Sequence, residues 1–218
     1  MDKAREHVLW GCRTMCARNY VLGTSGNISA RVSGGDLFVI TPTSMPYDEL
    51  RPEDLVVGSM DGSILQGARK PSIEFSMHLE IFRRRPDVAA IVHTHSAFAT
   101  AAGSMRGINE VPLMDIEAAL YLGGNIAVAP FAPPGSVSLA RHAADGLGSF
   151  AGVVLENHGA IGVGKTMRDA MTAADIVERA CQIFLTVSAA GEVKILPEEY
   201  AAACRLESAR KRGVAGPG

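Results

Sequence analysis

Three histidines and one glutamate have the residue types and local spacing of a metal site. His93 and His95 end the run Ala-Ala-Ile-Val-His-Thr-His, and His158 follows a second apolar run, Gly-Val-Val-Leu-Glu-Asn. Side chains two positions apart on a strand point to the same face, so His93 and His95 can bind one ion while Thr94 points away. Three neutral imidazoles plus an open position make the ligand set of a catalytic zinc site, not of a closed structural one. The spacing therefore predicts a metalloenzyme.

A structural interpretation of the same residues has to be weighed. Two core histidines with satisfied hydrogen bonds would give the same pattern, but burying two imidazoles side by side without a shared partner is costly. The third histidine, followed by Gly159, favours the metal interpretation. Glu74 is either a helix N-terminal carboxylate or a functional group, as a fourth ligand or a general base. The remaining histidines are His7, His78 and His142. They lie in expected helices, without a second histidine at ligand spacing, and are interpreted as structural.

Small hydroxyl and amide side chains gather in loops that glycine and proline punctuate. They are Thr24, Ser25, Asn27, Thr43, Ser44 and Ser72. Backbone N–H groups and hydroxyls in such loops can cradle a phosphate. Most loops of this composition are only turns, so the residues by themselves leave both interpretations open.

Composition and charge limit the classes of protein that come into question. The chain has 218 residues, of which 47% are hydrophobic, and a formal charge of −2. A net charge this small gives no reason to expect nucleic acid as a partner, and no apolar run is long enough to span a bilayer. The N-terminus alternates charges and lacks the apolar stretch of a signal peptide. We therefore expect one cytoplasmic domain over residues 1–212 and a disordered tail over 213–218.

Periodicity and turn residues predict the elements that position these side chains. Helices are expected over residues 2–20, 73–85, 138–147, 166–190 and 197–211, with another that Ser96 can cap. Strands are expected over 28–32, 37–41, 54–60, 63–66, 88–94, 125–129, 153–157 and 160–163, with an irregular stretch before residue 125. Hairpins in the first third, and helices beside the histidine strands, predict an α/β fold with three α/β/α layers around a mixed, mainly antiparallel sheet.

Five segments of the chain resemble motifs of the class II aldolase/adducin family. They are Gly-Thr-Ser-Gly-Asn-Ile-Ser-Ala-Arg (23–31), Ile-Thr-Pro-Thr-Ser-Met-Pro-Tyr-Asp-Glu-Leu (40–50), Lys-Pro-Ser-Ile-Glu (70–74), Val-His-Thr-His (92–95) and Asn-His-Gly (157–159). They occur in the family's order and run from near the N-terminus to the long late helix. In combination they are highly specific.

The resemblance implies a role for each matching position. Metal ligands fall on His93, His95 and His158, the acid/base glutamate falls on Glu74, and phosphate-binding positions fall on Thr24, Asn27, Thr43, Ser44 and Ser72. It further implies Zn²⁺ as the cofactor, with Mn²⁺ or Co²⁺ as alternatives, a small sugar phosphate as the substrate, and a homotetramer with active sites at subunit interfaces.

The reaction that the resemblance implies is aldol cleavage of a ketose 1-phosphate through a zinc-stabilised enediolate. Two positions depart from the family pattern: Ile73 stands in place of a second serine, and Phe131 in place of a tyrosine contributed by a neighbouring subunit. Phenylalanine has no proton to give. Decarboxylation of a phosphorylated keto sugar acid and ribulose-phosphate 4-epimerisation, which use the same enolate chemistry, are therefore alternatives. A scaffold without activity, like adducin, is a third.

Overall fold

The computed structural model describes residues 1–213, which form both helices and strands. The helices are α1 (Asp2–Ala17), α2 (Phe75–Arg84), α3 (Ala97–Gly103), α4 (Ile116–Leu122), α5 (Val137–Leu147), α6 (Met167–Ala190) and α7 (Glu198–Arg212), with a 3₁₀ turn over Pro52–Asp54. The strands are β1 (Asn27–Arg31), β2 (Leu37–Ile40), β3 (Val56–Ser59), β4 (Ile64–Gln66), β5 (Ala90–Thr94), β6 (Glu110–Val111), β7 (Ile126–Ala129), β8 (Gly152–Leu155) and β9 (Gly159–Gly164). Gly213 caps α7 in the left-handed conformation, and the rest of the expected tail, 214–218, lies outside the described residues.

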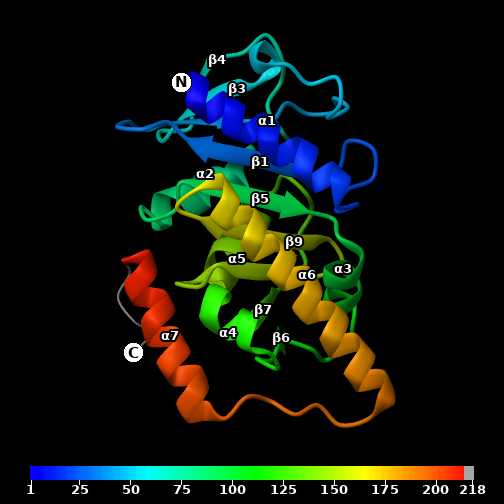
Figure 1. Cartoon of the computed structure of the whole chain (residues 1–218). Helices are drawn as coiled ribbons and strands as arrows, with labels where there is room; N and C mark the ends of the chain where they lie inside the picture. The colour runs from blue at the N-terminus through cyan, green and yellow to red at the C-terminus, as the bar shows by residue number, and fades with distance from the viewer. Residues whose placement is uncertain (214–218) are drawn as a thin grey trace.

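The strands form one nine-stranded sheet in the order β4-β3-β2-β1-β5-β9-β8-β7-β6. Strands β7 and β8 pair in parallel, and the other neighbours pair antiparallel. Helices α1 and α6 cross one face of the sheet, while α2 and α5 lie against each other on the other face (Figure 1). The predicted three-layer α/β fold with a mixed, mainly antiparallel sheet is confirmed.

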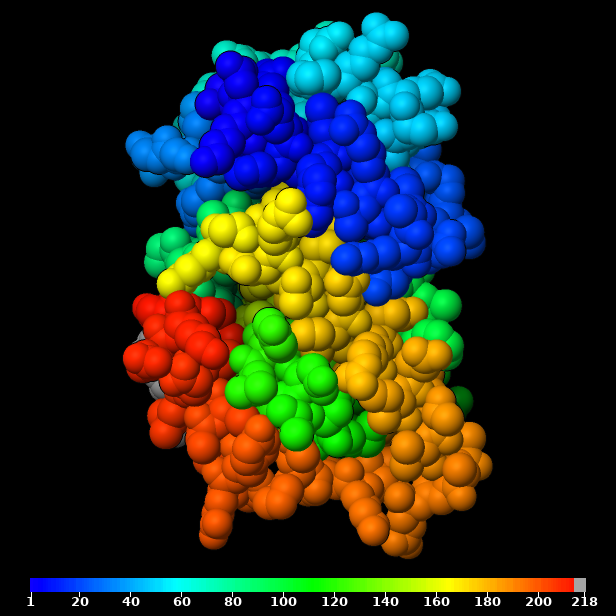
Figure 2. Space-filling view, viewed as in Figure 1, coloured from blue at the N-terminus to red at the C-terminus, as the bar shows by residue number. Residues whose placement is uncertain are grey.

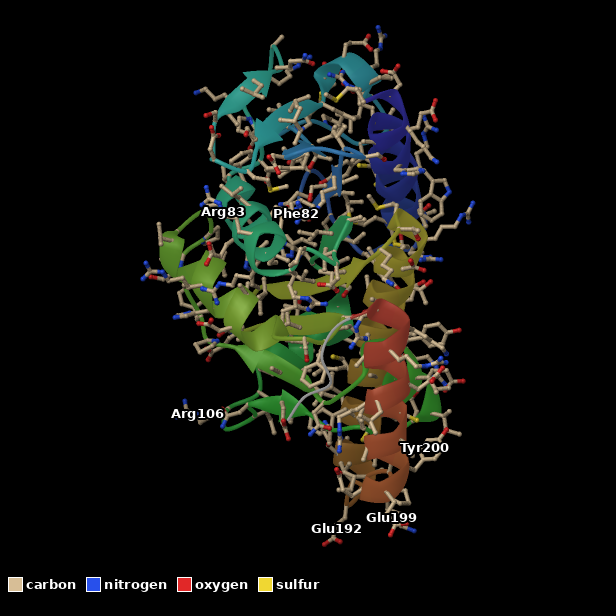
Figure 3. The ribbon with its side chains drawn as sticks, turned by 90° about the vertical axis from the view of Figure 1, so that its left-hand side faces the viewer. Phe82, Arg83, Arg106, Glu192, Glu199 and Tyr200 are labelled. Carbon is tan, nitrogen blue, oxygen red and sulfur yellow. The ribbon has the colours of Figure 1, made fainter. Side chains whose placement is uncertain are left out.

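Alternation along the strands divides the core between the two faces. On β5, Val92 packs in the cluster under α1 and the start of α6, whereas Ile91 packs in the cluster that includes α2 and α5. Figure 3 labels two neighbours on α2, Phe82, which is buried in this second cluster, and Arg83, which is exposed. The N-terminal elements lie at one end of the molecule, and the beginning of α7 lies at the other (Figure 2). Within residues 1–213, no helix combines the length and the apolar character that crossing a membrane requires.

Helix α6 begins as the sequence predicts. The backbone N–H of Asp169 donates to the Thr166 hydroxyl at 3.1 Å, and the N–H of Thr166 donates to the Asp169 carboxylate at 3.0 Å. This reciprocal capping box satisfies donors that the first turn of a helix would otherwise leave free.

Two expectations about the middle of the chain are wrong. The stretch before residue 125 is not irregular, because it holds β6 and α4. Helix α4 begins where the Asp115 carboxylate accepts from Ala118 N–H and ends at Gly123 with φ 86°.

Ser96 precedes α3, but its side chain does not cap that helix. Its hydroxyl accepts from Thr94 instead, and the Glu178 carboxylate of α6 accepts from the first N–H groups of α3.

Candidate metal centre

Strand β5 buries His93 on the face of the sheet that α2 covers. His93 points to the same side as Ile91, two residues earlier, and its side chain is 0% exposed. Across the sheet it pairs with Asn27 of β1 and with Ile161 of β9. Its position is therefore set by backbone pairing on both sides.

The turn between β8 and β9 brings His158 to the end of β5. Asn157 adopts a left-handed conformation with φ 55°, and the N–H of His158 donates to the Leu155 carbonyl at 3.1 Å. At Gly159, a Cβ atom would lie 2.0 Å from the Thr94 carbonyl oxygen, so this close approach of two strands requires glycine. The pairing of β9 with β5 then holds His158 beside His95.

The three imidazoles converge on one point. Their ring centroids lie 4.9 Å (His93–His95), 4.9 Å (His93–His158) and 4.8 Å (His95–His158) apart. His93 Nδ1 lies 3.0 Å from the Ala160 carbonyl and must donate to it, so in the neutral ring His93 Nε2 carries a bare lone pair. That lone pair faces His95 Nε2 at 3.1 Å. Ring nitrogens so arranged suit a divalent ion, with the Ala160 carbonyl as the outer partner that orients the ligand.

Burial also keeps two of the rings in the form that binds metals. It lowers the pKa of His95 to about 3, with His93 and His158 acting in the same direction. Burial, followed by the charge of His93, lowers the pKa of His158 to about 4. Both imidazoles are therefore neutral at neutral pH, and metal binding requires the neutral form.

Glu74 lies at the start of α2 with its carboxylate against these rings. One oxygen, Oε2, is 3.0 Å from His93 Nε2, and the other, Oε1, is 3.3 Å from His158 Nε2. Burial alone would raise the pKa of this carboxyl group. The neighbouring His93 and the amide of Asn27, with a smaller effect of His158, together lower the pKa below its usual value. In turn, although burial acts in the opposite direction, the Glu74 carboxylate raises the pKa of His93. The buried group is therefore a carboxylate within reach of the metal position.

The hydroxyl-bearing loops line one cavity of about 370 Å³ together with these groups. Its described lining includes Leu22, Thr24, Ser25, Gly26, Asn27, Pro42, Thr43, Ser44, Ser72, Ile73, Glu74, His95, Pro134 and His158, and no lysine or arginine. The residues expected to act as metal ligands, as acid/base or in phosphate binding thus all meet here except His93, which is fully buried and not among the lining residues. Two backbone hydrogen bonds join the loops, from Thr43 N–H to Lys70 at 3.1 Å and from Ser72 N–H to Thr41 at 3.0 Å.

The two departures from the family pattern lie at different places. Ile73 is 62% exposed and belongs to the cavity lining. Phe131 is 55% exposed and is not among the lining residues, and its backbone N–H donates to the Glu156 carboxylate at 2.7 Å.

The interpretation of His78 from sequence missed its surroundings. This side chain is fully buried, with one ring nitrogen 2.6 Å from the Ser29 hydroxyl and the other 2.5 Å from Asn27 Oδ1. Spacing held a signal, because His78 follows Glu74 by four residues, and residues so spaced share one face of a helix.

Comparison with known proteins connects this site to a family. Residues 6–185 match the model of the Class II Aldolase and Adducin N-terminal domain. The 5-deoxy-D-ribulose 1-phosphate aldolase of Bacillus thuringiensis serovar kurstaki is 36% identical over 91% of this chain and 92% of its own length. The L-fuculose phosphate aldolase of Escherichia coli is 31% identical over 91% and 90%. A solved L-fuculose 1-phosphate aldolase superposes with a TM-score of 0.89 at 26% identity, over 95% of this chain and 96% of its own.

Proposed function

Because this chain belongs to the class II aldolase and adducin family and is an aldolase-family lyase, we propose that it cleaves a ketose 1-phosphate with the help of a divalent ion, in the first place zinc. The observation that carries the proposal is one cavity in which neutral imidazoles, a buried carboxylate and hydroxyl loops meet. His93, His95 and His158 are the proposed ligands, and Glu74 is the proposed acid/base.

The proposed metal chemistry needs three oriented, neutral imidazoles. When bound there, a divalent ion supplies Lewis-acid stabilisation of the negative charge that the carbonyl oxygen gains as a carbon–carbon bond breaks. The protein's own part is to orient the rings. The hydrogen bond from His93 Nδ1 to Ala160 fixes which nitrogen of that ring is free.

Glu74 is proposed to move the proton. In the cleavage of a ketose 1-phosphate, the hydroxyl on carbon 4 loses its proton as the bond between carbons 3 and 4 breaks and the aldehyde forms. Carbon 3 keeps the electron pair and must then gain a proton. One carboxylate beside both atoms can accept the first proton and deliver it to carbon 3, so the atoms balance without an external acid. This route requires no proton from position 131, where the chain carries phenylalanine.

The hydroxyl loops are proposed to hold the phosphate through Thr24, Asn27, Thr43, Ser44 and Ser72. Ser44 has φ 57°, a conformation that turns successive backbone N–H groups toward a common side and is typical of anion-binding loops. Because the described lining contains no lysine or arginine, recognition would depend on neutral N–H and O–H donors.

Between the two substrates named for the relatives, we favour 5-deoxyribulose 1-phosphate. Cleavage between carbons 3 and 4 releases acetaldehyde from this sugar but lactaldehyde, which carries one more hydroxyl, from L-fuculose 1-phosphate. The cavity lining includes three apolar residues, Leu22, Ile73 and Pro134, of which Leu22 and Ile73 are 86% and 62% exposed. This apolar part of the lining favours the aldehyde half without a hydroxyl, because a hydroxyl set against it gains no hydrogen bond.

Phe131 supports a second candidate. A decarboxylase of a phosphorylated keto sugar acid, or a ribulose-phosphate 4-epimerase, would use the same ion and the same carboxylate without the family tyrosine. One solved structure that superposes on this chain with a TM-score of 0.85, at 25% identity, is described as a putative aldolase/epimerase/decarboxylase from Klebsiella pneumoniae.

A cytoplasmic homotetramer with active sites between subunits is part of the proposal. Phe131 and Val137, 55% and 64% exposed, flank the loop that carries Pro134 of the cavity. Large apolar side chains exposed together are typical of a contact with another chain. Sedimentation equilibrium would measure the mass of the assembly, and a monomer that is fully active would contradict this part.

A substrate panel tests the function directly. The protein is stripped with a chelator, reloaded with Zn²⁺, Mn²⁺ or Co²⁺, and offered 5-deoxyribulose 1-phosphate, L-fuculose 1-phosphate, a phosphorylated keto sugar acid and ribulose 5-phosphate. We expect aldehyde from the ketose 1-phosphates, in the metal-loaded protein only, and more from the 5-deoxy sugar. Release of CO₂ or formation of an epimer would favour the second candidate. A metal-loaded protein that turns over none of them would contradict the proposal.

A further inference from the structure

A chain of hydrogen bonds leads from Glu74 away from the cavity and into the core. Asn27 Nδ2 donates to Glu74 Oε2 at 2.8 Å, Asn27 Oδ1 lies 2.5 Å from His78 Nε2, and Ser29 Oγ lies 2.6 Å from His78 Nδ1. Each of the four side chains is exposed by 4% or less. Buried polar groups that satisfy one another in this way rigidify their surroundings.

The direction of every bond follows from the carboxylate. An ionised carboxylate only accepts, so the NH₂ group of Asn27 must face Glu74 and its carbonyl oxygen must face His78. His78 Nε2 therefore carries the hydrogen and donates, and Nδ1 accepts from the Ser29 hydroxyl. Burial lowers the pKa of His78 to about 3. The charge of His93 also lowers this pKa, whereas the charge of Glu74 raises it. A neutral ring with one donor and one acceptor agrees with this pattern.

Secondary structure brings the four residues together. Asn27 and Ser29 are two apart on β1, so both point toward α2, and their strand partners on β5 are His93 and Ile91. On α2, His78 lies one turn after Glu74, which is the N-cap. The imidazole thus bridges two neighbouring positions of β1, and Asn27 reaches across to the carboxylate.

We propose that His78 is a positioning residue, which holds the Glu74 carboxylate in its working orientation through Asn27. The inference rests on the role proposed for Glu74. Without a donor at His78, the Asn27 amide can rotate, and its carbonyl oxygen would then face the carboxylate and repel it. His78 is not itself among the lining residues of the cavity, and its side-chain hydrogen bonds go to Asn27 and Ser29, so its effect on Glu74 has to pass through Asn27.

The experiment compares His78→Phe, which keeps a ring but has no donor, with His78→Gln, whose amide nitrogen can replace Nε2. Ser29→Ala removes the far partner, and Ser208→Ala is its matched control, because Ser208 is also a buried hydroxyl, bonded to Arg212 on α7. Metal content, melting temperature, kcat and KM are measured for each. Loss of a partner that orients a reactive group typically costs about 10–100-fold in activity. We expect that loss mainly in kcat for His78→Phe, with a smaller change in KM and metal content unchanged, and substantial rescue in His78→Gln.

A tautomer measurement keeps the test independent of activity and of folding in the variants. The ¹⁵N spectrum of histidine-labelled wild-type protein, with His78 assigned by its absence from His78→Gln, should show hydrogen on Nε2 and none on Nδ1. Hydrogen on Nδ1 would overturn the proposal, as would wild-type kcat in His78→Phe at full metal loading, or equal losses in His78→Phe and His78→Gln. If the wild-type protein turned over no substrate while the expected tautomer was found, the proposed function would fail and the hydrogen-bond chain would stand.

Discussion

The imidazole wall of the cavity, which is made by His93, His95, His158 and Glu74, differs in construction from the hydroxyl loops, residues 22–27, 41–45 and 70–73. Strand pairing on both sides fixes His93, whose side chain is 0% exposed. The loop residues Thr24 and Ser44 are exposed, and two backbone hydrogen bonds join the second and third loops. Both regions line the same cavity, although His93 is not itself among the lining residues.

This difference indicates a division of labour. Groups that meet reacting atoms must be held in a narrow range of positions, which packed strands provide better than loops. A phosphate is larger and accepts hydrogen bonds on several oxygens, so donors on loops can bind it with less exact placement. We therefore expect substitutions in the imidazole wall to abolish or strongly lower turnover. Substitutions in the hydroxyl loops should change mainly the apparent affinity for substrate.

The largest effect is expected from His95→Ala. Removal of one of three imidazole ligands leaves a site too weak to retain a divalent ion through purification, so metal and activity should be lost together. Elemental analysis after gel filtration measures the first, and aldehyde release measures the second. His142→Ala is the control, since that ring bonds to the Pro130 carbonyl and lies outside the cluster. Full metal stoichiometry in His95→Ala would remove this ligand assignment.

Glu74→Gln should lower kcat by about 10²–10⁴-fold, the usual range for general acid–base catalysis, while the metal stays bound. The amide keeps the shape of the side chain but cannot take up a proton. Glu80→Gln is the control on the same helix, because Glu80 pairs with Arg84 on the surface. Turnover close to wild type in Glu74→Gln would show that another group moves the proton.

How much of the imidazole wall could be predicted depends on the range of the interactions. The same-face placement of His93 and His95 follows from strand geometry alone. The arrival of His158 does not, because it depends on the pairing of β9 with β5 and on a turn at Asn157 with φ 55°. The residue types made His158 a candidate third ligand, and the combination of family motifs then assigned it that position in advance. The residues alone also left the role of Glu74 open, because the partners of its carboxylate lie far along the chain.

The features that were missed share a physical cause. Helix α4 has seven residues, too few for a periodic apolar pattern to emerge. The partners of His78, Asn27 and Ser29, lie 51 and 49 residues away, so the one local signal, its spacing of four residues from Glu74, could not identify them. Ser96 has the right type and position for a cap, but Glu178 on α6 takes that role through tertiary contact. Local sequence patterns predicted most helices and strands, whereas long-range packing decided which side chains cap a helix or bond to a buried group.

Gly159→Ala tests whether the strand pairing, rather than the imidazoles alone, makes the wall. The added methyl group would meet the Thr94 carbonyl at 2.0 Å, so β5 and β9 must separate locally. Forced overpacking of this kind costs about 1–3 kcal/mol, which should lower the melting temperature and weaken metal binding. Gly191→Ala is the matched control, because no atom lies within 4 Å of a Cβ added there. Unchanged stability and metal affinity in Gly159→Ala would show that this contact does not hold His158.

Thr43→Val should give the most confined effect, limited to the binding of substrate. Threonine and valine have nearly the same shape, so the change removes a hydroxyl from the hydroxyl loops and leaves the backbone bond from Thr43 N–H to Lys70 in place. A hydrogen bond to a charged group contributes roughly 1.5–3 kcal/mol, so KM should rise by at least about tenfold with kcat and metal content unchanged. Inorganic phosphate should compete with substrate in the wild-type protein and compete less well in this variant.

Thr186→Val is the control, since that hydroxyl donates to the Gln182 carbonyl within α6 and is not part of the cavity. If KM stayed the same and phosphate did not inhibit, these loops would not be the phosphate site. A fall in kcat with KM unchanged would instead place Thr43 functionally with the imidazole wall, and the division between the two regions would not hold.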